Sequence, residues 1–299
     1  MICSLAIYRL EKVGSMNYGQ FVNGITWTRA QWAIIGKKKN LAAQRTSYEI
    51  LRSRGDNYWL HLEKLNAIQL GNEIISGFLN TPEWSCHLDK PSSKNGKAII
   101  QNLKSVLNQL PPYYDTLANQ RIETLDFKAR TVINIGTMPV LFVVSSIYSL
   151  FRQIKPRFGP VPSSKILHMA VPNLFMMWDN AIFKNYGVPR DLFGYRSYIA
   201  FLVLMQQSVQ HIKESFSKGL NISYQNLCKH INNKFGYKNL PITRLLDIAN
   251  YAIGGKNIGA PDIDCPQCIE KANLILDGLE NDQNTSEMMR VVKIRRYRH

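Results

Sequence analysis

Lys165 and Asp179 are the two charged side chains of an otherwise uncharged, largely apolar stretch, GPVPSSKILHMAVPNLFMMWDN, at residues 159–180. A lysine whose pKa is depressed can act as a nucleophile. A carboxylate beside it can orient the amine, act as a base or stabilise a developing cation. A second short helix is expected to begin at Pro172, and a turn before it would bring the two side chains together. The pair indicates either a reactive site or a buried ion pair that only fixes the packing of two helices.

The turn before Lys165 predicts how this lysine is positioned. Pro160 and Pro162 favour an extended or turning backbone, and Ser163 is a suitable N-cap for a helix over residues 163–170. Lys165 would then lie in the first turn, where the helix dipole disfavours a cation unless an anion is bound there. His168, three residues further on, would share its face. The expected ligand of such a helix start is a phosphate.

The segment FGPVPSSKILHMA, residues 158–170, resembles the hairpin of the helix-hairpin-helix DNA glycosylase superfamily, in which a glycine-containing turn opens a helix that grips the DNA backbone. The resemblance implies a base-excision glycosylase and lyase that flips a base into a pocket, with Lys165 attacking the deoxyribose C1′ and Asp179 assisting. Trp178 or Phe175 would stack on the flipped base. The same stretch is also similar to an uncharacterised all-helical family, which implies no function. The DNA-binding residues would be Lys155, Arg157, Gly159, Ser163, Ser164 and His168.

The charge balance indicates a polyanionic partner. The chain of 299 residues has 37 Lys and Arg against 21 Asp and Glu, a net charge of +16. Such an excess is typical of proteins that bind nucleic acid or an anionic membrane surface, although it also serves solubility. Walker A, dinucleotide-binding and hydrolase motifs are missing, so no nucleotide cofactor and no other cofactor is predicted. We expect nucleic acid as the partner, in the first place duplex DNA, and a non-catalytic nucleic-acid-binding module is the alternative to the enzyme.

Residues 131–151 form a run of 21 residues without a charge, which is long enough to span a bilayer. Asn134, Gly136 and three serines interrupt it, and polar groups are costly in a lone membrane span. Pro139 is expected to split the run, because an interior proline breaks a helix. The pattern favours a buried core helix over residues 140–151, with membrane association through residues 131–151 as the alternative.

The five cysteines indicate a reducing compartment, and we expect a cytoplasmic protein. Cys265 and Cys268 form a C-x-x-C motif, which would need two further ligands to hold zinc. Cys228 and His230 are the available pair, but residues two apart on a helix do not face the same way. We therefore predict no metal site. The five positions are Cys3, Cys86, Cys228, Cys265 and Cys268.

The elements that would position these groups are helical almost throughout, so the predicted fold class is all-α, a multi-helix globular bundle. The resemblance of residues 158–170 implies a bundle like that of the helix-hairpin-helix glycosylases. The best internal boundary is the Pro-, Ser- and Lys-rich break at residues 81–96. We predict a basic helical N-terminal region over 1–90, a helical body over 91–290 and a basic tail over 291–299. Expected helices cover residues 28–54, 57–79, 97–110, 113–130, 195–216, 222–235, 240–253 and 268–279.

Overall fold

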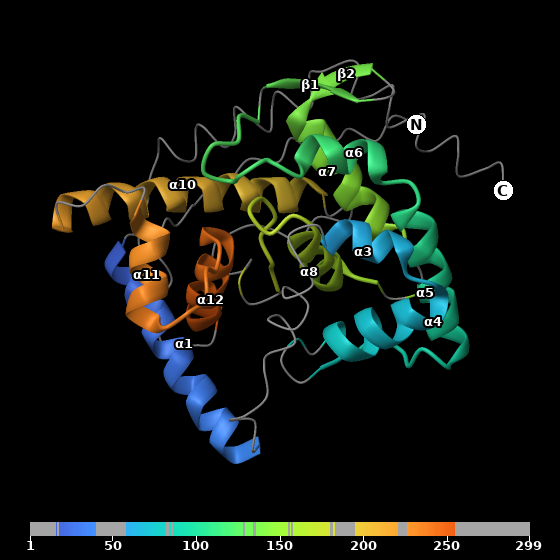
Figure 1. Cartoon of the computed structure of the whole chain (residues 1–299), viewed down its shortest axis with the longest axis horizontal. Helices are drawn as coiled ribbons and strands as arrows, with labels where there is room; N and C mark the ends of the chain where they lie inside the picture. Colours follow the sequence, from blue (N-terminus) through green and yellow to red (C-terminus); the bar gives the residue numbers. More distant parts are fainter. Residues whose placement is uncertain are drawn as a thin grey trace, which may run out of the picture.

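The computed structural model describes residues 16, 18–39, 58–81, 84, 86–127, 129–133, 136–154, 156, 158–179, 182, 195–220 and 226–254, and these residues form a mostly helical body (Figure 1). The all-α prediction is confirmed. The elements are α1 (Tyr18–Lys39), α3 (Tyr58–Lys64), α4 (Ala67–Gln69), the π-helix η1 (Leu70–Leu79), α5 (Lys94–Leu107), α6 (Pro111–Leu117), β1 (Arg130–Ile133), β2 (Gly136–Pro139), α7 (Val140–Arg152), α8 (Pro160–Ala170), α10 (Tyr195–Leu220), α11 (Leu227–Phe235) and α12 (Ile242–Gly254).

Helix α10 is the central element of the body. From Tyr198 to Val209 every residue is buried, because this part of the helix is apolar nearly all round and other elements cover it. Its Tyr198 ring stacks on Tyr148 of α7 with a centroid distance of 4.2 Å. Figure 1 shows α1, α11 and α12 beside one half of α10, whereas α3, α4 and α5 lie towards the opposite end of the long axis.

The first and last described helices pack against each other. The backbone of α1 comes so close to α12 at Gly24 that an added Cβ would lie 3.0 Å from backbone atoms of Ala249. The Thr28 hydroxyl donates to the carbonyl of Ile248 at 2.8 Å. Positions 220 residues apart are thereby held together inside the body.

The uncharged run at residues 131–151 is divided at Pro139, as predicted. Its first part forms the antiparallel pair β1–β2, with Arg130 opposite Pro139. Its second part is α7, whose residues from Val140 to Tyr148 are all buried. The helix expected over residues 113–130 is wrong, because Pro111 and Pro112 open the short helix α6, which ends at Leu117. Within the described ranges, the helices fall short of the length and apolar character needed to cross a bilayer.

One hydrophobic cluster includes buried residues from both sides of the break at residues 81–96, such as Ile75 of η1 and Leu103 of α5. Inside the break, Trp84 and Leu88 belong to the same cluster. The described residues therefore share a core across this segment. The division of the chain near residue 90 stays a prediction, and the tail over 291–299 lies outside the described residues.

Candidate functional site

Helix α8 begins earlier than the sequence suggested. Gly159 is its N-cap and Pro160 its first residue, and both prolines fit the first turn because their missing N–H groups need no partner there. The Ser163 hydroxyl donates to the Gly159 carbonyl at 2.8 Å from within the helix. The prediction of Ser163 as N-cap is wrong. Lys165 consequently lies in the second turn, away from the free amides of the helix start.

The Lys165 ammonium is held inside the protein. The side chain comes from α8 and the residue is 8% exposed. Its Nζ donates to the carbonyl of Trp84 at 2.7 Å and lies 3.6 Å from the Sγ of Cys86. The same Nζ is 5.3 Å from the centroid of the Trp84 ring. A carbonyl dipole and an aromatic face thus compensate part of the cost of burying this charge.

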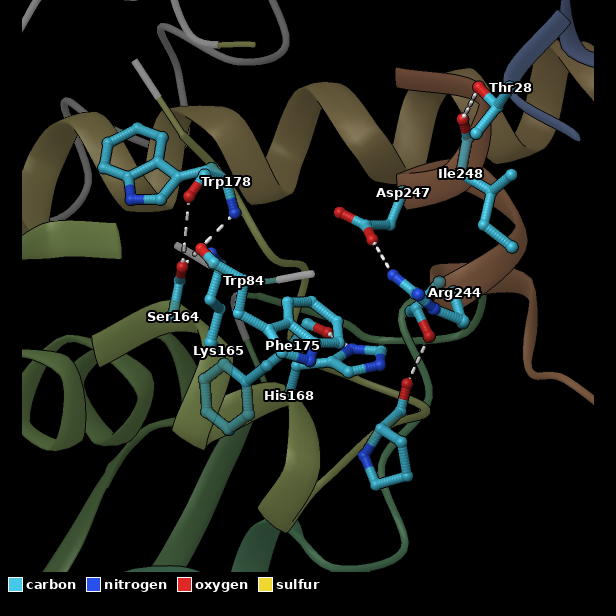
Figure 2. Close-up of polar contacts among 12 residues, drawn as sticks. Thr28, Trp84, Ser164, Lys165, His168, Phe175, Trp178, Arg244, Asp247 and Ile248 are labelled. Atoms are coloured by element: carbon cyan, nitrogen blue, oxygen red, sulfur yellow. Dashed lines mark hydrogen bonds and ion pairs between the residues drawn. The ribbon is translucent and has the colours of Figure 1, made fainter. Parts of the chain in front are cut away.

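A second buried cation contacts the same indole. The Cζ of Arg244, from α12, is 4.9 Å from the Trp84 ring centroid, and Figure 2 shows both cations beside Trp84. Arg244 Nη1 donates to the carboxylate of Asp247, one turn further along α12. Trp84, Lys165, Arg244 and Asp247 form the group that we call the Trp84 cluster.

Asp247 is the buried carboxylate of the Trp84 cluster. Burial raises its pKa to about 6, although Arg244 and Lys165 both act to lower it. Asp179 also acts on this carboxyl and raises its pKa. Asp179 is therefore in the electrostatic field of the cluster, while its Oδ1 accepts a hydrogen bond from the Ile182 N–H at 2.9 Å.

Lys165 and Asp179 thus act on the same buried carboxylate, but their hydrogen bonds go to different partners. Among the described residues, Lys165 donates to Trp84 and contacts Cys86. An amine can attack a sugar carbon only when it reaches the substrate, so Lys165 would first have to leave the Trp84 carbonyl. The catalytic roles of Lys165 and Asp179 stay predictions.

The Cys86 thiol is half-buried next to Lys165. Burial raises its pKa, and Lys165 offsets part of this effect. Since the thiolate is the nucleophilic form of cysteine, the site favours the unreactive thiol at neutral pH. Cys86 therefore serves the packing of Lys165 in this structure.

The other predicted site residues of α8 and of the segment after it are buried. The Ser164 hydroxyl accepts from the Trp178 N–H at 3.2 Å, and His168 Nδ1 donates to the Phe175 carbonyl at 2.7 Å. Ser163, Ser164 and His168 have no exposed surface. The expected DNA contacts of these three residues are therefore corrected. Ser164 and His168 tie α8 to Trp178 and Phe175, whereas Ser163 bonds the start of α8 itself. A DNA contact would require α8 to move.

The aromatic residues expected to stack on a base are enclosed by α7 and α10. Trp178 packs edge-on against Tyr198 with a centroid distance of 5.4 Å, and its ring is 5.5 Å from Phe201. Phe175 is 1% exposed. Neither Trp178 nor Phe175 offers a face to a flipped base in this structure, and both belong to the core.

Several predicted positions are differently placed or not described. Gly159 is half-buried, and its carbonyl is occupied by Ser163. Lys155, Arg157, Cys265 and Cys268 lie outside the described residues. Within the described part of the chain, no three His, Cys, Asp or Glu side chains are grouped to hold a metal ion.

The sequence did not reveal Trp84, Arg244 and Asp247 as partners of Lys165. The Lys165–Trp84 hydrogen bond joins residues 81 positions apart, which no local pattern indicates. One usable signal existed: Arg244 and Asp247 are charged residues three apart in the apolar sequence ITRLLDIANYAIG. When two charged side chains lie on the buried face of a helix, their remaining polar atoms need partners from other elements.

The surface is a second candidate site. Among the described residues, ten exposed side chains are basic and three are acidic. The exposed acidic residues are Asp115, Asp126 and Glu214. The exposed basic residues are Lys64, Lys90, Lys94, Lys97, Arg121, Arg130, Lys218, Lys229, Lys234 and Lys238. Arg121 forms an ion pair with Glu123 at 2.8 Å. The exposed basic side chains still outnumber the exposed acidic ones, so the described surface has a positive excess.

Comparisons with known proteins do not add a function to these two sites. No protein-family model matches the chain, and neither a curated protein nor a solved structure matches it. What the protein does must therefore be inferred from its own side chains.

Proposed function

We propose that the protein binds nucleic acid through phosphate contacts made by its exposed lysines. The observation that carries the proposal is the exposed charge of the described residues, ten basic side chains against three acidic ones. Ammonium groups facing water can replace the counterions condensed on a nucleic acid, and the release of those counterions drives binding.

The same charge would also attract an anionic membrane, but the exposed apolar surface favours nucleic acid. Peripheral membrane helices bury large apolar side chains in the interface. Among the described residues, the exposed large hydrophobic side chains are Ile68 and Tyr251, which lie on different elements. Lysines without an accompanying apolar face suit a phosphate backbone better than a lipid surface.

The Trp84 cluster has a structural role in this proposal. Lys165, Arg244 and Asp247 are each 8% exposed or less, and they join α8 and α12 to the segment that contains Trp84. Base excision through Lys165 and Asp179 is a separate proposal, which depends on the sequence resemblance and on release of the lysine from its carbonyl partner.

Equilibrium binding to a labelled duplex of about 20 base pairs, repeated over a salt series, tests the proposal. We expect log K to fall linearly with log salt, by about 0.9 for each phosphate contact. Vesicles of phosphatidylserine provide the comparison, and sedimentation with them should be weaker than duplex binding. Absence of duplex binding at low salt, or tighter binding to the vesicles, would overturn the proposal.

A further inference from the structure

Two groups of basic side chains could contact nucleic acid, and they differ in net charge. The α5 surface has five cations (Lys64, Lys90, Lys94, Lys97 and Lys104) on α3, α5 and the segment before α5. Three carboxylates (Glu63, Glu73 and Asp89) lie on α3, η1 and the same segment, and Glu73 pairs with His61 at 3.1 Å. Lys104 is also engaged, because its ammonium donates to the Glu63 carbonyl. The α11 surface has six cations (Arg121, Lys213, Lys218, Lys229, Lys234 and Lys238) and two carboxylates (Glu123 and Glu214). Arg121 and Glu123 form an ion pair at 2.8 Å. The α11 surface therefore has the larger positive excess.

The cations of the α11 surface come from three parts of the chain that lie together. Burial raises the pKa of Cys228 on α11 to about 11; Glu123 adds to this effect, while Arg121 and Lys213 oppose it. These groups are thus close enough to act on one thiol. The ring of Phe216 on α10 also contacts that of His230 on α11, at 5.4 Å. The Gln210 amide of α10 also donates to the Glu123 carbonyl at 3.1 Å. The C-terminal half of α10, the turn at residues 121–123 and α11 consequently form one region, and Figure 1 shows α11 beside that half of α10.

The loop after α11 is held in a fixed conformation, which positions Lys238. Gly236 ends the helix in the left-handed conformation, with φ of 68°. The Asn232 amide then donates to the carbonyls of Cys228 and Leu240 and accepts from the Leu240 N–H at 2.9 Å. A lysine on a loop closed in this way needs less ordering on binding than one on a free chain.

The uncharged residues of the α11 surface indicate which nucleic acid it fits. Asn226, Asn233 and Asn239 are exposed between the lysines and can donate hydrogen bonds to phosphates. Among the described aromatic residues of α11 and the loop after it, Phe235 is buried and Tyr237 is half-buried, so neither ring is fully exposed for stacking. Binding of single strands generally uses exposed aromatic side chains on which bases stack.

We infer that the α11 surface is the docking site for the phosphate backbone of a nucleic-acid duplex. This inference rests on the proposed function and adds the location and the strandedness of the ligand. The contacts would be electrostatic and independent of base sequence, because lysines and short amides contact phosphates and do not read base edges.

Two triple variants with the same change in charge test the location. In the first, Lys229, Lys234 and Lys238 are replaced by Gln, which preserves helix propensity. In the second, Lys90, Lys94 and Lys97 are replaced by Gln. For the first variant we expect the salt dependence, the slope of log K against log salt, to fall in magnitude by about 2 to 3, and the affinity to fall more than about tenfold. The second variant should stay within about threefold of the wild type.

The outcomes separate this inference from the proposed function. If the wild type binds no duplex, the proposed function itself fails. If the wild type binds but the α5 variant loses as much affinity as the α11 variant, the function stands and the location is wrong. If a single strand of equal length outcompetes the duplex, the inference that the ligand is double-stranded is wrong. Circular dichroism of both variants, with unchanged melting, excludes loss of fold as the cause.

Discussion

Asp247 should make the stability of this protein fall as the pH rises through the weakly acidic range. Its pKa is about 6 in the fold, and the ordinary value expected in the unfolded chain is 3.8. At about 1.36 kcal/mol for each pKa unit, this difference corresponds to about 3 kcal/mol of unfolding free energy. The cause is burial, which outweighs the attraction of Arg244 and Lys165 for the ionised form.

Stability falls with rising pH because the folded protein favours the protonated form of Asp247. Below about pH 3.8 Asp247 is protonated in both states, so its full contribution is present. Between about pH 4 and pH 6 the folded protein binds more protons than the unfolded chain, and stability decreases with rising pH. Roughly 2 kcal/mol of the effect should fall between about pH 4.5 and pH 7.5.

Urea unfolding of the wild type and Asp247→Asn across this pH range measures the effect. The variant keeps an acceptor for Arg244 but does not titrate, so the wild-type stability minus that of the variant should decrease by about 2 kcal/mol with rising pH. Asp115→Asn removes an exposed carboxylate and should leave the pH dependence of the wild type nearly unchanged. The reasoning would be refuted if the unfolding free energy of the wild type minus that of Asp247→Asn stayed constant or increased with pH.

Further substitutions test the packing and the lysine. Gly96→Ala would place a Cβ 1.9 Å from the Lys90 carbonyl oxygen, and we expect a loss of about 3 kcal/mol in urea unfolding; Gly219→Ala, which meets no atom within 4 Å, should instead gain up to about 1 kcal/mol from helix propensity. Asn232→Ala removes the hydrogen bonds that close the loop after α11 and should lower stability by about 2 to 3 kcal/mol by the same measurement. If base excision does occur, Lys165→Ala should abolish borohydride-trapped adducts with damaged duplexes; trapping that persists in this variant would contradict the lysine assignment.

The helices were predictable where the signal is local. Pro139 separates α7 from the preceding strands, and Gly236 ends α11 in the conformation that glycine favours. The predicted N-cap of α8, Ser163, lies four residues after the actual one, Gly159, because two prolines favour a turn although the first helical turn accepts both. The strands β1 and β2 have four residues each and lie inside an apolar run, so no clear alternation of polar and apolar residues marks them.

The surroundings of Lys165 could not be predicted, because they depend on contacts distant in sequence. Asp179 is near in the chain and was the natural partner to expect, whereas the groups that contact the ammonium belong to residues 84 and 86. The choice between these partners is decided by how α8 packs against the rest of the body, and a residue pattern gives no measure of that packing.

The hydrogen bond between Thr28 and Ile248 has a consequence for the synthesis of the protein. A ribosome releases α1 long before α12 exists, and 220 residues separate the two bonded positions. Until α12 emerges, the face of α1 around Gly24 lacks the helix that covers it, and the Trp84 ring lacks its arginine neighbour. Folding of the body must therefore wait for nearly the whole described chain. A premature stop before Ile242 should yield an aggregation-prone chain rather than a smaller folded protein.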